Sequence, residues 1–192
     1  MTNGISIKEQ GIIRSKTAKP LLWVALAGMT MIFASLTSAY VVRQADSDWL
    51  AFELPSVFYY STAIILISSL TLVFADISAK KDNQKGVKLG LITTLFLSLA
   101  FVVSQFEAWS QMMDQGLYFS GSGISSSFLY VLTLVHLLHV FGGNITLLVT
   151  TIKGYKGKYS SKDKLGIELA SWYWHYLTGV WMFLLIFLLY IQ

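Results

Sequence analysis

Five long apolar stretches, separated by short polar segments, make up most of the sequence. None of them has Lys, Arg, Asp or Glu in its interior, and each has close to or more than the ~20 apolar residues that a helix needs to cross a bilayer. We therefore predict an all-α polytopic membrane protein, a five-transmembrane-helix bundle that forms a single membrane domain over residues 1–192. The predicted helices span approximately residues 21–42, 57–75, 89–106, 124–152 and 169–191.

Basic residues predict the orientation of these helices. All but Arg43 of the 14 Lys and Arg residues lie before the first stretch, between the second and third, or between the fourth and fifth. Because positive charge is retained on the cytoplasmic side, we expect the N-terminus inside and the C-terminus outside. Pro20 and Pro55 precede the first two stretches, as suits a helix start. The first stretch is longer than a usual signal-peptide core, so we expect it to be kept as a helix.

Composition narrows the possible functions. Hydrophobic residues make up 55% of the chain and charged residues only 12%, about half the charge of a typical soluble domain. The absence of cysteine excludes disulfides, thiolate zinc or copper sites, iron–sulfur clusters and covalent c-type haem. No phosphate-binding glycine loop or nucleophile elbow is present. We predict no catalytic, cofactor-binding or metal-ligating residue in this chain, and no nucleic-acid partner.

Polar side chains inside the membrane are concentrated in the last two helices. His136 and His139 are three residues apart and share one helix face. Gly142 and Gly143, one turn further on, would let a neighbouring helix approach closely. Neutral imidazoles and other polar groups commonly join helices by hydrogen bonds. We therefore expect interhelical structural roles, linking the fourth and fifth helices, for His136, His139, Glu168 and His175.

Two other interpretations of these residues remain open. A membrane haem protein would need His136 or His139 opposite His175 as axial ligands, and three histidines on two helices are a small supply. A small membrane carrier or channel could use Glu168 and the histidines as proton or ion relays. The spans have no interior charge or proline, which counts against a carrier with broken helices.

Aromatic residues near the ends of membrane helices usually anchor at the lipid interface. The last helix is rich in them, and Glu107 and Trp109 close the third helix at its expected outer end. Glu107 can reach headgroup water there. We expect contact with lipid or a partner subunit from Trp172, Trp174, Trp181, Glu107 and Trp109.

Three segments resemble a known family. Residues 132–143, with His-Leu-Leu-His followed by Gly-Gly, resemble the His-x-x-His-x-x-Gly stretch of subunit III of haem–copper terminal oxidases, the cytochrome c and quinol oxidases. Residues 168–181, with Trp-Tyr-Trp-His and a further Trp six residues later, resemble the final helix of that family. Residues 105–109, Gln-Phe-Glu-Ala-Trp, are similar to its segment before the long outer loop.

The resemblance implies a non-catalytic subunit of a bacterial inner-membrane oxidase that pumps protons and supports aerobic electron transport to oxygen. Such a subunit has no redox centre of its own, because haem and copper lie in partner subunits. It binds phospholipid, stabilises oxidase subunit I, and adjoins subunit II and other oxidase subunits, in some cases within a respiratory supercomplex. The chain resembles the short five-helix bacterial form, without the first two of seven helices.

Two positions depart from the family pattern. Leu36 stands where the larger form often has a buried carboxylate, and Thr178 stands where an acidic residue is common, three positions after His175. A role of those carboxylates in proton supply is therefore not implied for this chain.

Overall fold

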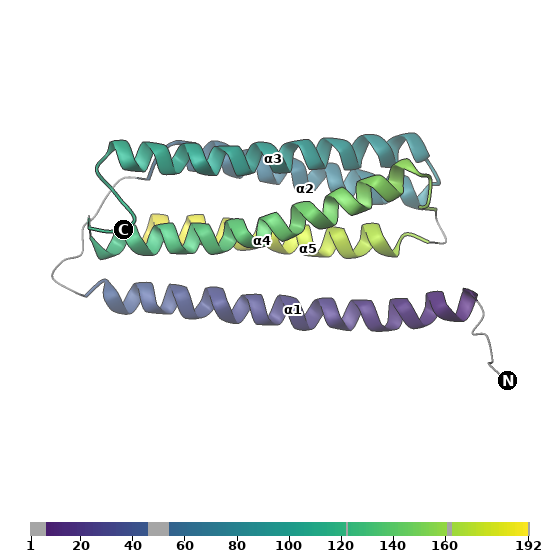
Figure 1. Cartoon of the computed structure of the whole chain (residues 1–192), viewed down its shortest axis with the longest axis horizontal. Helices are drawn as coiled ribbons and strands as arrows, with labels where there is room; N and C mark the ends of the chain where they lie inside the picture. The colour runs from purple at the N-terminus through teal and green to yellow at the C-terminus, as the bar shows by residue number, and fades with distance from the viewer. Residues whose placement is uncertain (1–6, 46–53, 122, 161–162, 192) are drawn as a thin grey trace.

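The computed structural model describes residues 7–45, 54–121, 123–160 and 163–191, with side chains from residue 16 onward. Within these residues it contains five α-helices and no strand, which confirms the all-α fold and the five expected helices. Each helix has a segment long and apolar enough to cross a membrane. The helices, shown in Figure 1, are α1 Ile7–Arg43, α2 Val57–Lys80, α3 Gln84–Asp114, α4 Ile124–Tyr155 and α5 Leu165–Tyr190.

Most of the helices extend beyond the apolar stretches that predicted them. The 31 residues of α3 correspond to about 46 Å at ~1.5 Å per residue, which exceeds the ~30 Å thickness of the hydrocarbon core. The ends of such a helix emerge into the headgroup region, where charged residues are tolerated. Hydropathy therefore located the middle of each helix and missed its polar ends.

The start of α1 differs from the prediction. Pro20 was expected at the beginning of the helix, but it lies inside α1, which begins at Ile7. Proline removes one backbone hydrogen bond and crowds the carbonyl four residues earlier, Lys16 here. The residues between Ile7 and Pro20 contain no other proline, and the helix continues through the one interruption.

Helices α2 to α5 form a closed ring, and α1 lies outside it. In this ring α2 packs on α3, α3 on α4, α4 on α5, and α5 on α2. Among the described residues α1 contacts only α4 and α5, and these two helices separate it from α2 and α3 (Figure 1). We call α2 to α5 the ring.

Gly90 and Gly143 are two positions where ring helices approach closely. A Cβ atom on Gly90 of α3 would lie 2.8 Å from Cβ of Ala75 on α2, so only glycine fits there. A Cβ on Gly143 of α4 would lie 3.0 Å from the Trp174 ring on α5. The expectation that glycine in this part of α4 brings a neighbouring helix close is confirmed.

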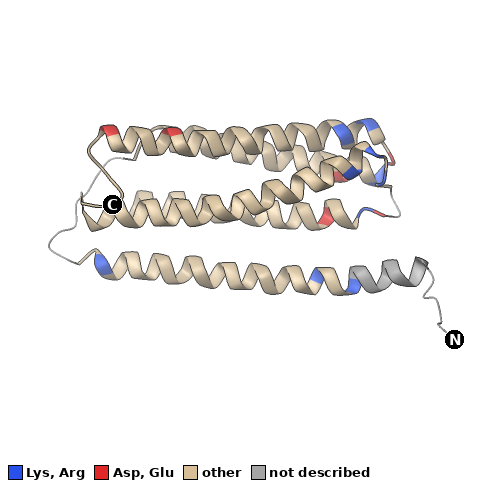
Figure 2. Cartoon of the chain, viewed as in Figure 1, with Lys and Arg blue, Asp and Glu red and all other residues tan. Residues whose placement is uncertain are grey.

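Charged residues mark the two ends of the bundle. Lys and Arg gather where α2 meets α3 and where α4 meets α5 (Figure 2). Among the described residues, the basic residue at the opposite end is Arg43, in the last turn of α1. The start of α1 and the end of α5 lie at opposite ends of the bundle (Figure 1). The lysine-rich end is the one we predict to face the cytoplasm. The side chains of Lys8, Arg14 and Lys162 lie outside the described residues.

Candidate interhelical polar sites

A row of hydrogen bonds joins α2 to α5 inside the ring. Trp174 Nε1 donates to Ser68 Oγ at 3.1 Å, and Trp181 Nε1 donates to Thr62 Oγ1 at 2.9 Å. The two tryptophans are seven residues apart, which places both on one face of α5. Since α2 and α5 are antiparallel, their partners follow in reverse order along α2.

His175 adds a third bond to this row. Its Nδ1 shares a hydrogen bond of 2.6 Å with Ser69 Oγ. We call the set the α2–α5 seam; its members are Thr62, Ser68 and Ser69 of α2 and Trp174, His175 and Trp181 of α5. Water in the hydrocarbon region is too scarce to replace these partners, so the bonds fix which faces of the two helices meet.

The seam changes the interpretation of two tryptophans. Trp174 and Trp181, expected to contact lipid or another subunit, are 0% and 2% exposed and lie inside the ring. Their spacing follows the inner face of α5, and the hydroxyls of α2 satisfy their indole N–H groups, so neither side chain needs the interface. Trp172, the other α5 tryptophan with this expected role, is half-buried.

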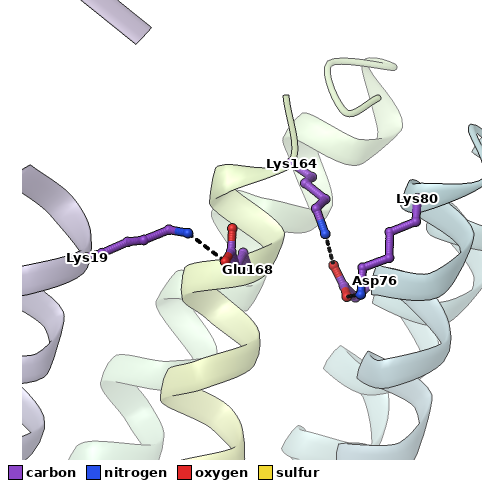
Figure 3. Close-up of polar contacts among 5 residues, drawn as sticks. All are labelled: Lys19, Asp76, Lys80, Lys164 and Glu168. Carbon is purple, nitrogen blue, oxygen red and sulfur yellow. Dashed lines mark hydrogen bonds and ion pairs between the residues drawn. The ribbon is translucent and has the colours of Figure 1, made fainter. Parts of the chain in front are cut away.

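Ion pairs occupy the lysine-rich end of the bundle. Lys19 Nζ of α1 lies 2.7 Å from Glu168 Oε1 of α5. Asp76 of α2 pairs with Lys80 at 2.8 Å and with Lys164 at 3.4 Å. Figure 3 shows both groups. Asp76 was not singled out from the sequence, although its position just after an apolar stretch, four residues before Lys80, was an available signal.

These pairs position helices more than they stabilise them. The side chains of Lys19 and Glu168 are 36% and 26% exposed, and partly exposed pairs of this kind are usually worth about 1 kcal/mol or less. Lys19 Nζ also lies 5.4 Å from the centre of the Trp172 ring. The Trp23 ring of α1 packs on the same indole, with 5.6 Å between the ring centres.

Further contacts continue along α1. Thr30 Oγ1 and Tyr176 Oη share a hydrogen bond of 2.8 Å. Just after the end of α1, Gln44 Nε2 donates to the Ile191 carbonyl at 2.8 Å. We call these the α1 contacts: Lys19 with Glu168 and Trp172, Trp23 with Trp172, Thr30 with Tyr176, and Gln44 with Ile191.

The two histidines of α4 have different surroundings. Nδ1 of His139 donates to the Val135 carbonyl of its own helix at 2.7 Å, and Tyr173 Oη of α5 donates to the His139 backbone carbonyl at 3.0 Å. His136 is fully buried, with its ring centre 5.1 Å from that of Trp181. Helices α4 and α5 therefore meet here through ring packing and a backbone carbonyl, while Glu168 and His175 bond to α1 and α2.

The pair expected at the outer end of α3 separates in the structure. Trp109 Nε1 donates to Thr133 Oγ1 of α4 at 3.0 Å, so its indole joins two ring helices. Glu107 is exposed and accepts a hydrogen bond of 3.4 Å from Gln111 on the same helix. Helix α3 continues to Asp114, so Glu107 does not close it as expected, and its carboxylate lies on the outer surface of the bundle.

The chemistry available here is that of hydrogen bonding and packing. Among the described side chains, no group of three or more His, Asp or Glu residues could hold a metal ion. His136 packs among aromatic rings, whereas His175 bonds to α2. At the two departures from the family pattern, Leu36 is partly buried against the core and Thr178 Oγ1 donates to the Trp174 carbonyl of its own helix at 3.0 Å.

Comparison with known proteins assigns this architecture to a family. Residues 50–192, which contain the whole ring, match the family model described as cytochrome c oxidase subunit III. Cytochrome c oxidase subunit 3 of Bacillus sp. (strain PS3) is 30% identical over 167 residues, covering 84% of this chain and 80% of that protein.

Longer relatives match over a smaller share of their length. The subunit 3 of Loxodonta africana is 33% identical over 125 residues, which cover 65% of this chain and 46% of that protein. The probable subunit 3 of Rickettsia felis is 31% identical over 142 residues, covering 71% and 47%. The chain thus spans about half the length of these two relatives. On the extent of the family match and of the Bacillus alignment, the chain belongs to the cytochrome c oxidase subunit III family.

Proposed function

We propose that this chain is a non-catalytic subunit that stabilises the redox core of a proton-pumping haem–copper oxidase. The observation that supports the proposal best is the α2–α5 seam. Its indole, imidazole and hydroxyl groups hold two helices in a fixed register inside an apolar bundle. A ring fixed in this way presents a constant outer surface, which suits a scaffold for a neighbouring subunit.

The family and the five apolar helices make the chain a multi-pass protein of the inner membrane. Its proposed partners are oxidase subunit I, as the main contact, and subunit II. We assign haem and copper to those partners. In this chain the lack of cysteine leaves no thiolate for a copper centre.

Phospholipid is the second proposed ligand. Lys19 is partly exposed and lies against Trp172 at the lysine-rich end. A cationic side chain beside an interfacial tryptophan suits the phosphate of a headgroup, and exposed apolar side chains of α1 such as Leu21 and Val24 suit its acyl chains.

The experiment that tests the scaffold role compares two histidine variants in the native membrane. A tagged chain is recovered in mild detergent, and the co-purifying proteins are identified by mass spectrometry while haem is measured by absorption. We expect recovery of haem-containing oxidase subunits with the wild type. His175→Ala removes the Ser69 bond and lowers the yield of complex, whereas the haem spectrum per complex stays unchanged.

His139→Ala is the matched control, because the imidazole of His139 bonds to its own helix. It should reduce the yield less than His175→Ala. Recovery of the wild-type chain without oxidase subunits would overturn the proposal. A Soret band in the purified single chain would favour the haem-protein interpretation instead, and loss of a haem or copper signal from an intact His175→Ala complex would contradict a purely structural role.

A further inference from the structure

Two buried polar side chains of the ring do not belong to the α2–α5 seam. His136 of α4 is 0% exposed and Gln105 of α3 is 1% exposed. Both ring nitrogens of His136 and both amide atoms of Gln105 are without a hydrogen-bond partner among the described residues. Two fully buried side chains therefore have all of their polar atoms unsatisfied, which is uncommon in folded proteins.

Neighbouring contacts place the two side chains at the same level of the bundle. Trp109 of α3 bonds to Thr133 of α4, and the Phe101 ring of α3 lies 6.0 Å from the His136 ring. Gln105 is four residues from both Trp109 and Phe101, one helical turn from each. Its turn of α3 is therefore opposite the turn of α4 that runs from Thr133 to His136.

Aromatic rings surround the imidazole of this pair. The ring centres of Phe33, Phe101 and Trp181 lie 6.2, 6.0 and 5.1 Å from that of His136. Phenylalanine has no hydrogen-bonding group, and the indole N–H of Trp181 already donates to Thr62. The rings around His136 thus offer it no conventional hydrogen bond.

We propose that His136 and Gln105 bind a buried water molecule between them. A neutral imidazole has one donor and one acceptor, and a carboxamide has both kinds of group. Water can donate to one residue and accept from the other, which matches the atoms left over on each side. Burying such groups without partners is costly, and internal waters commonly satisfy polar atoms of this kind.

Along α4, within the described residues, the site is separated from other unsatisfied polar atoms. The next unsatisfied polar atom along the inner face of α4 is Nδ2 of Asn144, whose Oδ1 accepts from Ser98. Eight residues separate it from His136, a rise of about 12 Å along a helix, which is several times the ~2.8 Å between hydrogen-bonded waters. Val140, between them, is fully buried and apolar.

Solid-state NMR on the full-length chain tests the proposal directly. The chain is labelled with ¹⁵N-histidine and reconstituted in phosphatidylcholine vesicles, and magnetisation is transferred from water protons to the ring nitrogens. The His136 signals are assigned as those lost in His136→Phe. We expect transfer from water to His136 in the wild type. Its absence in the wild type would overturn the proposal, whatever the variants do.

Substitution of the second residue locates the water. Gln105→Leu should abolish the transfer to His136, and Gln105→Met, which preserves side-chain length, gives the same test if the leucine variant does not fold. Gln111→Leu on the same helix is the control and should leave the transfer unchanged. Transfer that persists in both Gln105 variants would contradict a shared water.

A proton-flux measurement separates an isolated site from a path. Vesicles containing the wild-type chain should hold a pH gradient as long as empty vesicles do. A leak that disappears in the Gln105 variants would show that the polar groups form a conducting path, and would overturn the assignment of an isolated water.

Discussion

Helix α1 and the ring have similar apolar character, yet they are built into the protein differently. In the most apolar window of α1, 17% of the residues are buried, against 39% to 44% in the other four helices. The ring helices each pack on two ring neighbours, whereas α1 contacts only α4 and α5 among the residues that the structure describes. Hydropathy finds all five helices, but it does not distinguish a helix that is enclosed from one that is attached.

The polar contacts of α1 and of the ring also differ, and they show this distinction where hydropathy does not. The two indole bonds of the seam, made by Trp174 and Trp181, are uncharged and buried. The α1 contacts are partly exposed, and they include the ion pair of Lys19 with Glu168 and a bond from Gln44 to a backbone carbonyl. Partly exposed pairs contribute little to stability. We therefore expect the seam to stabilise the ring, and the α1 contacts mainly to fix the position of α1.

Loss of a seam tryptophan should give the largest effect. Trp174→Ala removes a fully buried indole and leaves Ser68 without its donor, and large-to-small changes of this kind cost about 3–5 kcal/mol. Unfolding of the purified chain by SDS, followed by circular dichroism, measures the loss. Trp172→Ala, at a half-buried position on the same helix, is the control, and an equal loss in both variants would contradict a distinction between ring and surface.

Adding a side chain, instead of removing one, also tests whether the ring is packed more tightly than α1. Gly143→Leu forces a side chain against the Trp174 ring, and overpacking typically costs about 1–3 kcal/mol. Gly28→Leu in α1 meets nothing within 4 Å, so its stability should match or exceed that of the wild type. Thermal unfolding of both variants in one detergent provides the comparison. A larger loss in Gly28→Leu would mean that α1 is the more tightly packed element.

A single hydroxyl of the seam should have a smaller effect. Ser68→Ala removes the acceptor for Trp174 Nε1, and interhelical hydrogen bonds in membranes contribute about 0.6 kcal/mol on average and at most about 1.7. Ser35→Ala is the matched control in α1, where the exposed hydroxyl bonds to its own helix. SDS unfolding should rank Ser68→Ala below Ser35→Ala in stability, and the reverse order would count against the seam.

Cutting the ion pair of α1 should change its position more than the stability of the protein. Glu168→Gln removes the partner of Lys19 at a cost of about 1 kcal/mol or less. Spin labels at Gly28→Cys and Gly179→Cys, two open positions on α1 and α5 in a cysteine-free chain, report the distance between them. We expect a broader distance distribution in Glu168→Gln, whereas Asp76→Asn should leave it unchanged. A distribution that stays narrow without Glu168 would show that other contacts fix α1.

The sequence predicted the fold well because a membrane helix is defined locally. An uninterrupted apolar stretch is sufficient to predict a helix, and Gly143 correctly indicated a close approach within the ring. The error at Pro20 arose because proline is compatible with a helix interior at the loss of one bond. Whether the helix continues before it depends on the preceding residues, which hydropathy does not evaluate.

The polar sites were harder to predict because they depend on pairs of helices far apart in the sequence. Glu168 and His175 were recognised as polar groups of α5, but their partners, Lys19 and Ser69, lie in α1 and α2. The serines and threonines of α2 gave little signal alone, since such residues usually bond to their own helix. Trp174 was assigned to the interface because aromatic residues near a span end usually anchor there.

The contact between α2 and α5 constrains the order in which the helices assemble. Helix α2 must wait for the last helix to be made before its serines meet their indole donors. Among the described residues, helix α1 has no contact with α2 and packs on α4 and α5, which are made later. A nascent chain that ends before Leu165 therefore lacks α5, which packs on both α1 and α2 in the finished protein. In such a chain Ser68 and Thr62 of α2 are still without the indole donors that α5 supplies.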